Sequence, residues 1–185
     1  MKMKSLSEMI YQWICYLCPD VYVGSIFDID LEELKKNGFS GIILDLDNTL
    51  VKPKSREVSQ EVMDWLKNME QLEYKRCLVS NSLLKRVQIF SDKFGIPFIS
   101  RAAKPRKKVF WQALNKLGTK PEQTIMIGDQ LFTDILGGKR IGLFTILVSP
   151  LDKQELWTTF LIRYPEKLIL KWLRNRGLLK PLDVK

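Results

Sequence analysis

Short, continuous apolar runs recur along the middle of the chain and constrain its fold more than any other feature. The run Gly41-Ile-Ile-Leu-Asp45 is followed by helical spacing of apolar residues over 59–72. Apolar strands that alternate with helices are typical of a parallel sheet covered on both faces. The sequence therefore predicts an α/β fold, a Rossmann-like parallel sheet of about five strands with helices on both faces. The further strands are expected at 76–80, 97–100, 124–128 and 143–148, and the further helices at 83–94, 105–117 and 130–140.

The chain divides into three parts around this pattern. Residues 41–150 hold the alternating elements and are predicted to form the core. Residues 1–40 are predicted to be a helical extension packed on it. Residues 151–185 carry eight Lys or Arg against four Asp or Glu. They are predicted to form two basic amphipathic helices, separated at Pro165, which either pack on the core or lie on an anionic membrane.

Polar side chains gather directly after the predicted strands. The carboxyl ends of parallel strands meet at one edge of a sheet, and ligands bind there. Carboxylates crowded at one edge repel each other unless a cation is present, and a set of oxygen ligands suits Mg²⁺. A hydroxyl and an ammonium group at the same edge would bind a phosphate. The residues expected at this edge include Asp45, Asp47, Ser80, Asn81, Lys104 and Asp129.

The composition limits the chemistry further. The chain has no His, which excludes His metal ligands and every mechanism with a His base. The formal net charge of +9 favours anionic partners such as phosphates, nucleic acid or acidic lipid headgroups, although it would also serve solubility alone. Three Cys without a disulfide framework indicate a reducing compartment.

Four motifs, in this order, resemble those of the haloacid dehalogenase (HAD) superfamily of phosphotransferases. The resemblance spans about residues 41 to 148, and each motif follows a predicted strand. One such Asp-rich turn would be weak evidence, but four in order are specific. The motifs are Asp45-Leu-Asp-Asn-Thr-Leu-Val51, Val79-Ser-Asn81, Lys104-Pro105, and Gly128-Asp-Gln-Leu-Phe-Thr-Asp134.

The resemblance implies a role for each residue. Asp45 would attack phosphorus and form an aspartyl-phosphate, and Asp47 would protonate the leaving oxygen and then activate water. Ser80 and Lys104 would contact the phosphoryl group. The metal ligands would be Asp45, the main-chain carbonyl of Asp47, and Asp129, with Asp134 supporting the metal or Lys104.

Two residues of these motifs have open roles. Thr49 is either a phosphate contact or a side chain that satisfies the turn, and Asn81 is either a substrate contact or a turn residue.

The spacing of the motifs leaves no room for a large cap. Only 34 residues lie between Asp45 and Ser80, enough for one helix and little more. An open site favours large substrates over small metabolites that need enclosure. Together with Cys18-Pro-Asp-Val-Tyr-Val-Gly-Ser-Ile-Phe-Asp-Ile29 and Gly137-Gly138, the motifs look like the capless subclass IIIA, YqeG-type branch. That branch includes phosphatidylglycerophosphate phosphatases.

The leading interpretation is therefore a Mg²⁺-dependent phosphatase that converts phosphatidylglycerophosphate to phosphatidylglycerol in phospholipid synthesis. Its partner would be an anionic lipid, met by peripheral contact at the inner face of a membrane. We read neither a signal peptide nor a membrane span, which favours the cytoplasm and leaves an organelle open. Two alternatives stay open: a nucleotide or nucleic-acid end phosphatase, and a non-enzymatic adaptor with the HAD fold. The oligomeric state is not determined.

Overall fold

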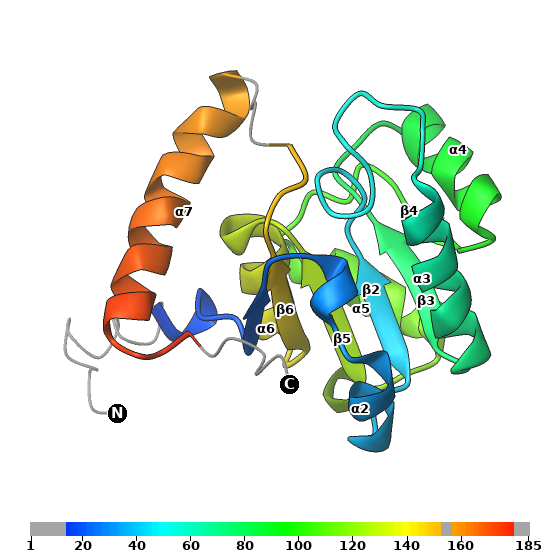
Figure 1. The fold of residues 1–185 in the computed structure, drawn as a ribbon, viewed down its shortest axis with the longest axis horizontal. Helices are drawn as coiled ribbons and strands as arrows, with labels where there is room; N and C mark the ends of the chain where they lie inside the picture. The colour runs from blue at the N-terminus through cyan, green and yellow to red at the C-terminus, as the bar shows by residue number, and fades with distance from the viewer. Residues whose placement is uncertain (1–13, 153–156, 180–185) are drawn as a thin grey trace.

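The computed structural model describes residues 14–152 and 157–179, and the side chains of 157–162 lie outside that description. The predicted α/β fold is confirmed: the strands pair in parallel in one sheet of order β1-β6-β5-β2-β3-β4 (Figure 1). The strands are β1 Val21–Val23, β2 Gly41–Leu44, β3 Lys75–Val79, β4 Phe98–Ile99, β5 Thr124–Gly128 and β6 Phe144–Val148.

β1 is a sixth strand that the sequence did not predict. It has only three residues, too few to show a periodicity. It forms because β6 offers a partner edge, on which Val21 pairs with Ile146. Asp20, just before β1, strengthens this pairing: its carboxylate accepts hydrogen bonds from the Thr145 main chain at 2.8 Å and from Lys139 at 2.6 Å. The edge strand is thus specified by its neighbours rather than by its own sequence.

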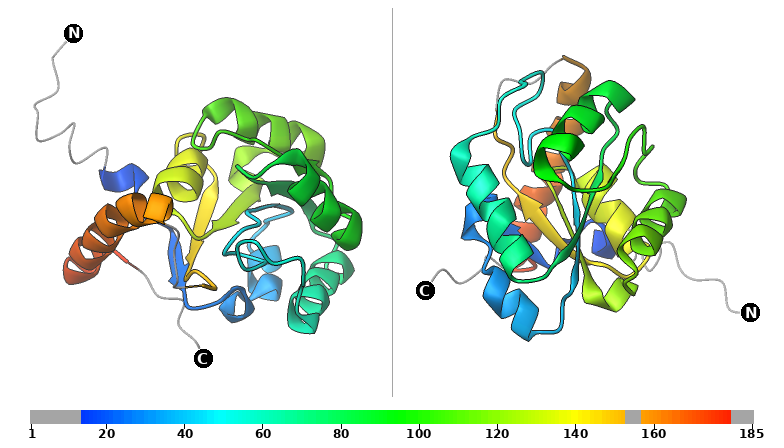
Figure 2. Two further views of the ribbon diagram at one scale, coloured as in Figure 1. Left: turned by 90° about the horizontal axis from the view of Figure 1, so that it is seen from above. Right: turned by 90° about the vertical axis from the view of Figure 1, so that its right-hand side faces the viewer.

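The central strand β2 shows why the apolar runs are continuous. All four of its residues are buried, because helices cover both faces of the sheet (Figure 2). Ile42 and Leu44 pack in one hydrophobic cluster with α2, α3 and α4, whereas Ile43 packs in another with α5. This alternation is the period of two of a strand buried on both faces. The helices are α2 Leu31–Lys36, α3 Gln60–Gln71, α4 Leu84–Phe94 and α5 Lys107–Leu117.

Helix ends follow the predicted signals where the sequence carries them. Gly95 and Gly118 end α4 and α5 in the left-handed conformation, with φ of 64° and 61°. Glycine adopts this conformation without a steric penalty. The helix expected over 130–140 is present over 131–139, but it begins with a π-helical turn, η3 Leu131–Ile135, which continues into the short α6 Leu136–Lys139.

The C-terminal part corrects one expectation. Instead of two helices broken at Pro165, there is one helix, α7 Trp157–Asn175, with Pro165 in its interior. A proline there costs about 3 kcal/mol of helix stability. Packing of Ile169 and Leu170 against a small cluster that includes Leu131 and Leu147 offsets this cost. The exposed face of α7 carries Lys167, Leu168, Lys171 and Arg174.

None of the helices in the described ranges combines the length and the apolarity that a membrane span requires. The helical extension predicted over 1–40 lies partly outside the described residues, which begin at residue 14. The side chains of 157–162, in the first of the two predicted C-terminal helices, also lie outside the description.

Candidate active site

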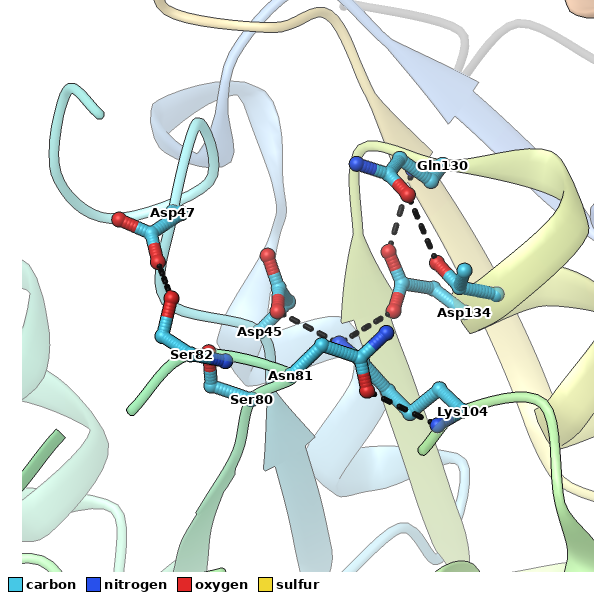
Figure 3. Close-up of a pocket in the computed structure, with 9 residues that line it drawn as sticks. Asp45, Asp47, Ser80, Asn81, Ser82, Lys104, Gln130 and Asp134 are labelled. Atoms are coloured by element: carbon cyan, nitrogen blue, oxygen red, sulfur yellow. Dashed lines mark hydrogen bonds and ion pairs between the residues drawn. The ribbon is translucent and has the colours of Figure 1, made fainter. Parts of the chain in front are cut away.

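The predicted site residues converge at the carboxyl edge of the sheet. A pocket of about 420 Å³ opens there (Figure 3). In the described part of the chain, no cap domain is inserted between the elements that form it. Two further predicted residues, Thr49 and Asp129, lie buried behind its wall. The residues that line the pocket are Asp45, Asp47, Ser80, Asn81, Ser82, Lys104, Gln130, Thr133 and Asp134.

Asp45 lies at the centre of this edge, directly after β2. Its main-chain N–H donates to the carbonyl of Ile127 at 2.9 Å, which ties it to the end of β5. Lys104 Nζ lies 2.5 Å from Asp45 Oδ1 and 2.6 Å from Asp134 Oδ1, and all three side chains are buried. One buried ammonium therefore links two carboxylates from different motifs.

Gly128 explains how Asp134 reaches this position. A Cβ atom at residue 128 would lie 2.4 Å from the carboxyl carbon of Asp134, so only glycine leaves room for that side chain. The second oxygen of Asp134 accepts a hydrogen bond from the Gln130 main chain at 3.1 Å. The Gly128-Asp-Gln-Leu-Phe-Thr-Asp134 motif thus folds back on itself to hold its last carboxylate against Lys104.

Thr49 connects Asp45 to the third buried carboxylate. Its hydroxyl lies 3.4 Å from Asp45 Oδ2 and 3.5 Å from Asp129 Oδ1. Oxygens of Asp45, Asp129 and Asp134 all lie within 4.8 Å of one another. Such a set of carboxylate oxygens suits a hard divalent cation.

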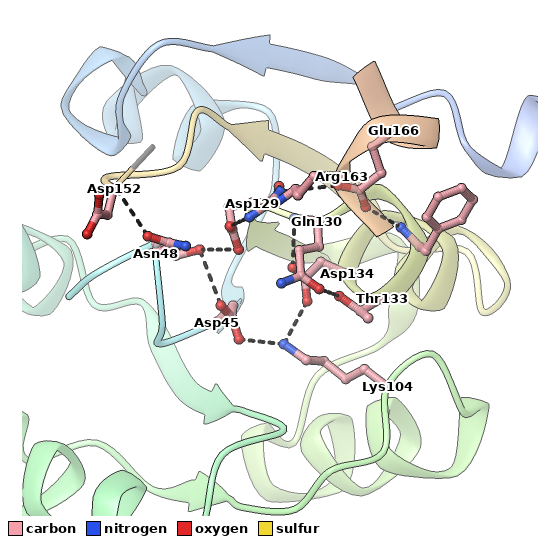
Figure 4. Close-up of polar contacts among 12 residues, drawn as sticks. Asp45, Asn48, Lys104, Asp129, Gln130, Thr133, Asp134, Asp152, Arg163 and Glu166 are labelled. Atoms are coloured by element: carbon pink, nitrogen blue, oxygen red, sulfur yellow. Dashed lines mark hydrogen bonds and ion pairs between the residues drawn. The ribbon is translucent and has the colours of Figure 1, made fainter. Parts of the chain in front are cut away.

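The other oxygen of Asp129 faces the C-terminal helix. Arg163 of α7 contacts Asp129 Oδ2 through Nη2, and its Nη1 donates to the Asp129 main-chain carbonyl at 2.5 Å. Glu166, one turn along α7, lies 3.2 Å from the same Nη1. Its other oxygen accepts from the main chain of Phe132 at 3.1 Å (Figure 4).

The buried charges of this cluster do not balance. Among the described residues, six charged side chains are buried, and all belong to this network: Asp45, Lys104, Asp129, Asp134, Arg163 and Glu166. If all six are ionised, the four carboxylates and two cations give a net charge of −2. A single divalent cation would neutralise this charge, so the residues fit the implied Mg²⁺.

The pKa values of the metal-free cluster express the same imbalance. Burial raises the pKa of Asp45 to about 7, with Lys104 opposing the shift and Asp134 adding to it. Burial likewise raises the pKa of Asp129 to about 8, against the opposing charge of Arg163. Burial alone would lower the pKa of Lys104, but Asp134 and Asp45 outweigh it and raise that pKa. The carboxyl groups thus hold protons where a cation would replace them.

Asp47 lies on the opposite, more open side of the pocket. The side-chain hydroxyl of Ser82 contacts one oxygen of its carboxylate. The Arg86 guanidinium contacts the other, with Nε at 2.8 Å and Nη2 at 2.6 Å. Arg86 also donates to the main-chain carbonyls of Ser55 and Lys52, at 2.7 and 3.1 Å. Arg86 therefore fixes both Asp47 and the loop that follows it.

The two residues after β3 differ in their function. Ser80 is buried at the pocket floor, where its hydroxyl oxygen accepts from the Ser82 main chain at 3.2 Å. Asn81 is exposed, and its side-chain oxygen accepts from the Lys104 main chain at 2.9 Å. Asn81 therefore holds the loop that carries Lys104.

Four contacts of the site were not predicted from the sequence. Ser82 and Arg86 follow a predicted motif by a few residues, but nothing in their spacing marks them. Arg163 and Glu166 lie 34 or more residues beyond Asp129. One signal was available in the sequence: Arg163 and Glu166 fall at helical spacing with the apolar Leu173. In the structure all three are buried on the face of α7 that faces the core.

Comparison with known proteins assigns this arrangement to a family. The HAD-hydrolase-like family model matches residues 101–150. The probable phosphatase YqeG of Bacillus subtilis (strain 168) is 41% identical over 162 residues, which are 88% of this chain and 94% of that protein. The chain belongs to the HAD-like phosphatase family. This confirms the resemblance on which the four motifs were identified.

This HAD phosphatase is also similar to a plant phosphatase in sequence and to a bacterial protein in fold. The chain is 29% identical to phosphatidylglycerophosphate phosphatase 1, chloroplastic/mitochondrial, of Arabidopsis thaliana over 181 residues, 91% of this chain and 51% of that protein. The chain therefore spans about half the length of that relative. A crystal structure of an uncharacterized protein from Listeria monocytogenes serotype 4b superposes with a TM-score of 0.52 at 20% identity, over 72% of this chain and 99% of that one. This last similarity shows the fold alone.

Proposed function

We propose that this HAD phosphatase hydrolyses phosphatidylglycerophosphate at a membrane surface, through a phosphorylated Asp45 and with Mg²⁺ bound. The observation that carries the proposal is the buried network of four carboxyl groups and two basic side chains beneath an open pocket. Around one cavity, this network would supply a carboxylate nucleophile, a set of ligands for a cation and an ammonium group.

The first half of the reaction transfers the phosphoryl group to the enzyme. Lys104 and the Ser80 hydroxyl bind its oxygens, and Asp45 attacks phosphorus. The bond from phosphorus to the leaving oxygen breaks, and Asp47 donates its proton to that oxygen. Arg86 and Ser82 hold Asp47 at the pocket wall throughout this step.

The second half returns the enzyme to its starting state. Asp47, now ionised, takes a proton from a water molecule that attacks the phosphorus of the aspartyl-phosphate. Phosphate leaves, the Asp45 carboxylate is restored, and Asp47 holds a proton again. Bound Mg²⁺, held by Asp45, Asp129 and the Asp47 carbonyl with support from Asp134, would act as a Lewis acid on the phosphoryl oxygens.

The rim of the pocket supports a lipid substrate. Leu83 and Leu84, at the start of α4, are 64% and 49% exposed, and they directly follow Ser82 of the pocket wall. Leu83 is the N-cap of α4 and makes no side-chain cap, so it lacks the helix-start role that Ser, Thr, Asp or Asn would have. Exposed Lys85 follows this pair, and exposed Arg101 donates its main-chain N–H to the carbonyl of Ser82, just before the pair, at 3.0 Å. Apolar and basic side chains together suit an anionic bilayer surface.

The similarity to phosphatidylglycerophosphate phosphatases of plants and algae supports the same substrate. The open pocket supports it as well, because a headgroup phosphate can enter while the acyl chains remain in the membrane.

Phosphate release from phosphatidylglycerophosphate in mixed micelles tests the proposal. We expect wild type to require Mg²⁺, to lose activity in EDTA, and to prefer the lipid over nucleotides, oligonucleotide ends and sugar phosphates. Asp45→Asn, which keeps the shape and removes the nucleophile, should reduce turnover about 10³-fold or more.

The outcomes separate the alternatives. If phosphate is released from nucleotides or nucleic-acid ends in preference to the lipid, the lipid substrate is wrong but the phosphatase activity stands. No release from any phosphate ester would leave the adaptor as the function to pursue.

A further inference from the structure

We propose that Arg163 of the C-terminal helix is a positioning residue for Asp129, so that α7 sets the affinity of the active site for its divalent cation. The inference rests on the metal site of the proposed function and extends it to a segment outside the four motifs. It concerns a part of the chain that lies beyond the residues matched by the family model, 101–150.

The geometry assigns the two oxygens of Asp129 to different partners. Oδ2 contacts Arg163, whereas Oδ1 lies on the side of Thr49 and Asp45. Because Arg163 also donates to the Asp129 main-chain carbonyl, it holds the residue at two points. Oδ1 is left facing the site where the carboxylates converge.

Glu166 fixes the guanidinium in turn. It contacts Arg163 on α7 and accepts the main-chain N–H of Phe132 in η3. The pair therefore bridges α7 to both Asp129 and the turn that follows it. A conformational change of α7 would move Asp129 with it.

Packing alone does not account for an arginine at this position. Arg163 is 5% exposed and Glu166 2% exposed, next to an apolar cluster that Ile169 and Leu170 extend. A buried ion pair is often no more stabilising than apolar side chains of similar volume. Arg163 itself supplies a positive charge: with all six groups ionised the buried network carries −2, and without Arg163 it would carry −3. Residues that hold a ligand carboxylate from behind commonly tune metal affinity about 10- to 100-fold.

Metal binding without substrate tests this role. Titration calorimetry with Mg²⁺ should give a dissociation constant about 10- to 100-fold higher for Arg163→Gln than for wild type. Arg163→Lys keeps the charge but loses the fork of donors, so it should fall between the two. The matched control is Arg174→Gln, a neutralisation on the exposed face of the same helix, which should leave the constant unchanged.

A second variant guards against misfolding of the first. Glu166→Gln keeps Arg163 in place and weakens only its support, so a smaller rise in the dissociation constant is expected. Unfolding curves without Mg²⁺ identify the folded fraction of each variant, so that affinity and stability are separated.

The results that overturn the inference are distinct from those that overturn the function. One such result is that folded Arg163→Gln binds Mg²⁺ with wild-type affinity while Asp129→Asn loses binding. The metal site would then be supported, but α7 would only pack against the core and would not influence the affinity. Tighter binding in Arg163→Gln would also overturn it, because Arg163 would then compete with the cation. Failure of the proposed function would appear instead as Mg²⁺ binding without hydrolysis of any phosphate ester.

Discussion

The two sides of the pocket hold their carboxylates in opposite ways. On one side, Asp45 and Asp129 are buried, at 6% and 3% exposure, and they share two buried cations with other acids. On the other side, the side chain of Asp47 is 25% exposed and pairs with Arg86, which is itself partly exposed. The buried side has the properties of a fixed cation site, whereas the open side leaves a carboxylate accessible to water and substrate. One sheet edge thus provides two environments for chemically identical groups.

Removing the buried ammonium group of Lys104 should give the largest effect, a loss of stability on the buried side of the pocket. Lys104→Met leaves Asp45 and Asp134 without their shared partner, and breaking a buried ion pair costs about 3 to 5 kcal/mol. Urea unfolding in EDTA measures this loss in the free energy of unfolding. Lys85→Met, at an exposed position of α4, is the control and should change it by less than about 0.5 kcal/mol. Equal stability of the two variants would contradict a stabilising ion pair between Lys104 and the carboxylates of Asp45 and Asp134.

The pH dependence of metal stabilisation should be the next largest effect. In the metal-free protein the pKa values of Asp45 and Asp129 are raised to about 7 and 8, so the folded state holds protons that the unfolded state releases above about pH 4. The free energy of unfolding therefore falls as the pH rises from about 4 towards 8. Mg²⁺ displaces these protons, so it should stabilise more at pH 8.5 than at pH 6.

Thermal unfolding with EDTA and with Mg²⁺ at the two pH values measures this difference. Mg²⁺ at 100 times its dissociation constant stabilises by about 2.7 kcal/mol. An identical Mg²⁺-induced shift at both values would show that protons and metal do not compete. Asp129→Asn should remove most of the shift at pH 8.5.

Arg86→Gln tests the open side. The substitution removes the contacts that hold Asp47 and the loop near Ser55. A positioned general acid–base accelerates a reaction about 10²- to 10⁴-fold, and the loss of part of this effect should lower kcat about 10- to 30-fold. The dissociation constant for Mg²⁺ should change less than kcat, because Arg86 contacts the side chain of Asp47 and none of the buried carboxylates. Lys93→Gln, exposed near the end of α4, serves as the control. A parallel loss of Mg²⁺ affinity would show that the two sides act as one unit.

The smallest effect is expected at the rim. Leu83→Ser with Leu84→Ser should weaken binding to vesicles rich in phosphatidylglycerol, by about 1 kcal/mol per partly buried leucine. Vesicle sedimentation measures the binding, and the ratio of lipid to p-nitrophenyl phosphate hydrolysis should fall with it. Ile89→Ser, on the same helix and also 49% exposed, is the matched control. Equal loss in the control would assign the effect to general surface hydrophobicity.

Most of the sheet could be predicted because its signals are local. The continuous apolar run Gly41-Ile-Ile-Leu predicts a strand that is buried on both faces, and Gly95 and Gly118 predict where their helices end. β1 could not be predicted in this way, since its three residues form a strand only beside β6. The continuous α7 was mispredicted at Pro165 because the contacts of Arg163 before the proline, and of Ile169 and Leu170 after it, outweigh its local cost.

The sequence by itself determined the chemistry of the edge. The motifs place Asp45, Asp47, Ser80 and Asp129 directly after strands and Lys104 a few residues after β4, and parallel pairing brings them together at one edge. Only the tertiary structure determined which basic side chain pairs with which carboxylate oxygen. Arg163 reaches Asp129 across 34 positions of sequence, and Arg86 reaches Asp47 across 39. No local pattern encodes such pairs, because they depend on how α4 and α7 pack against the finished sheet.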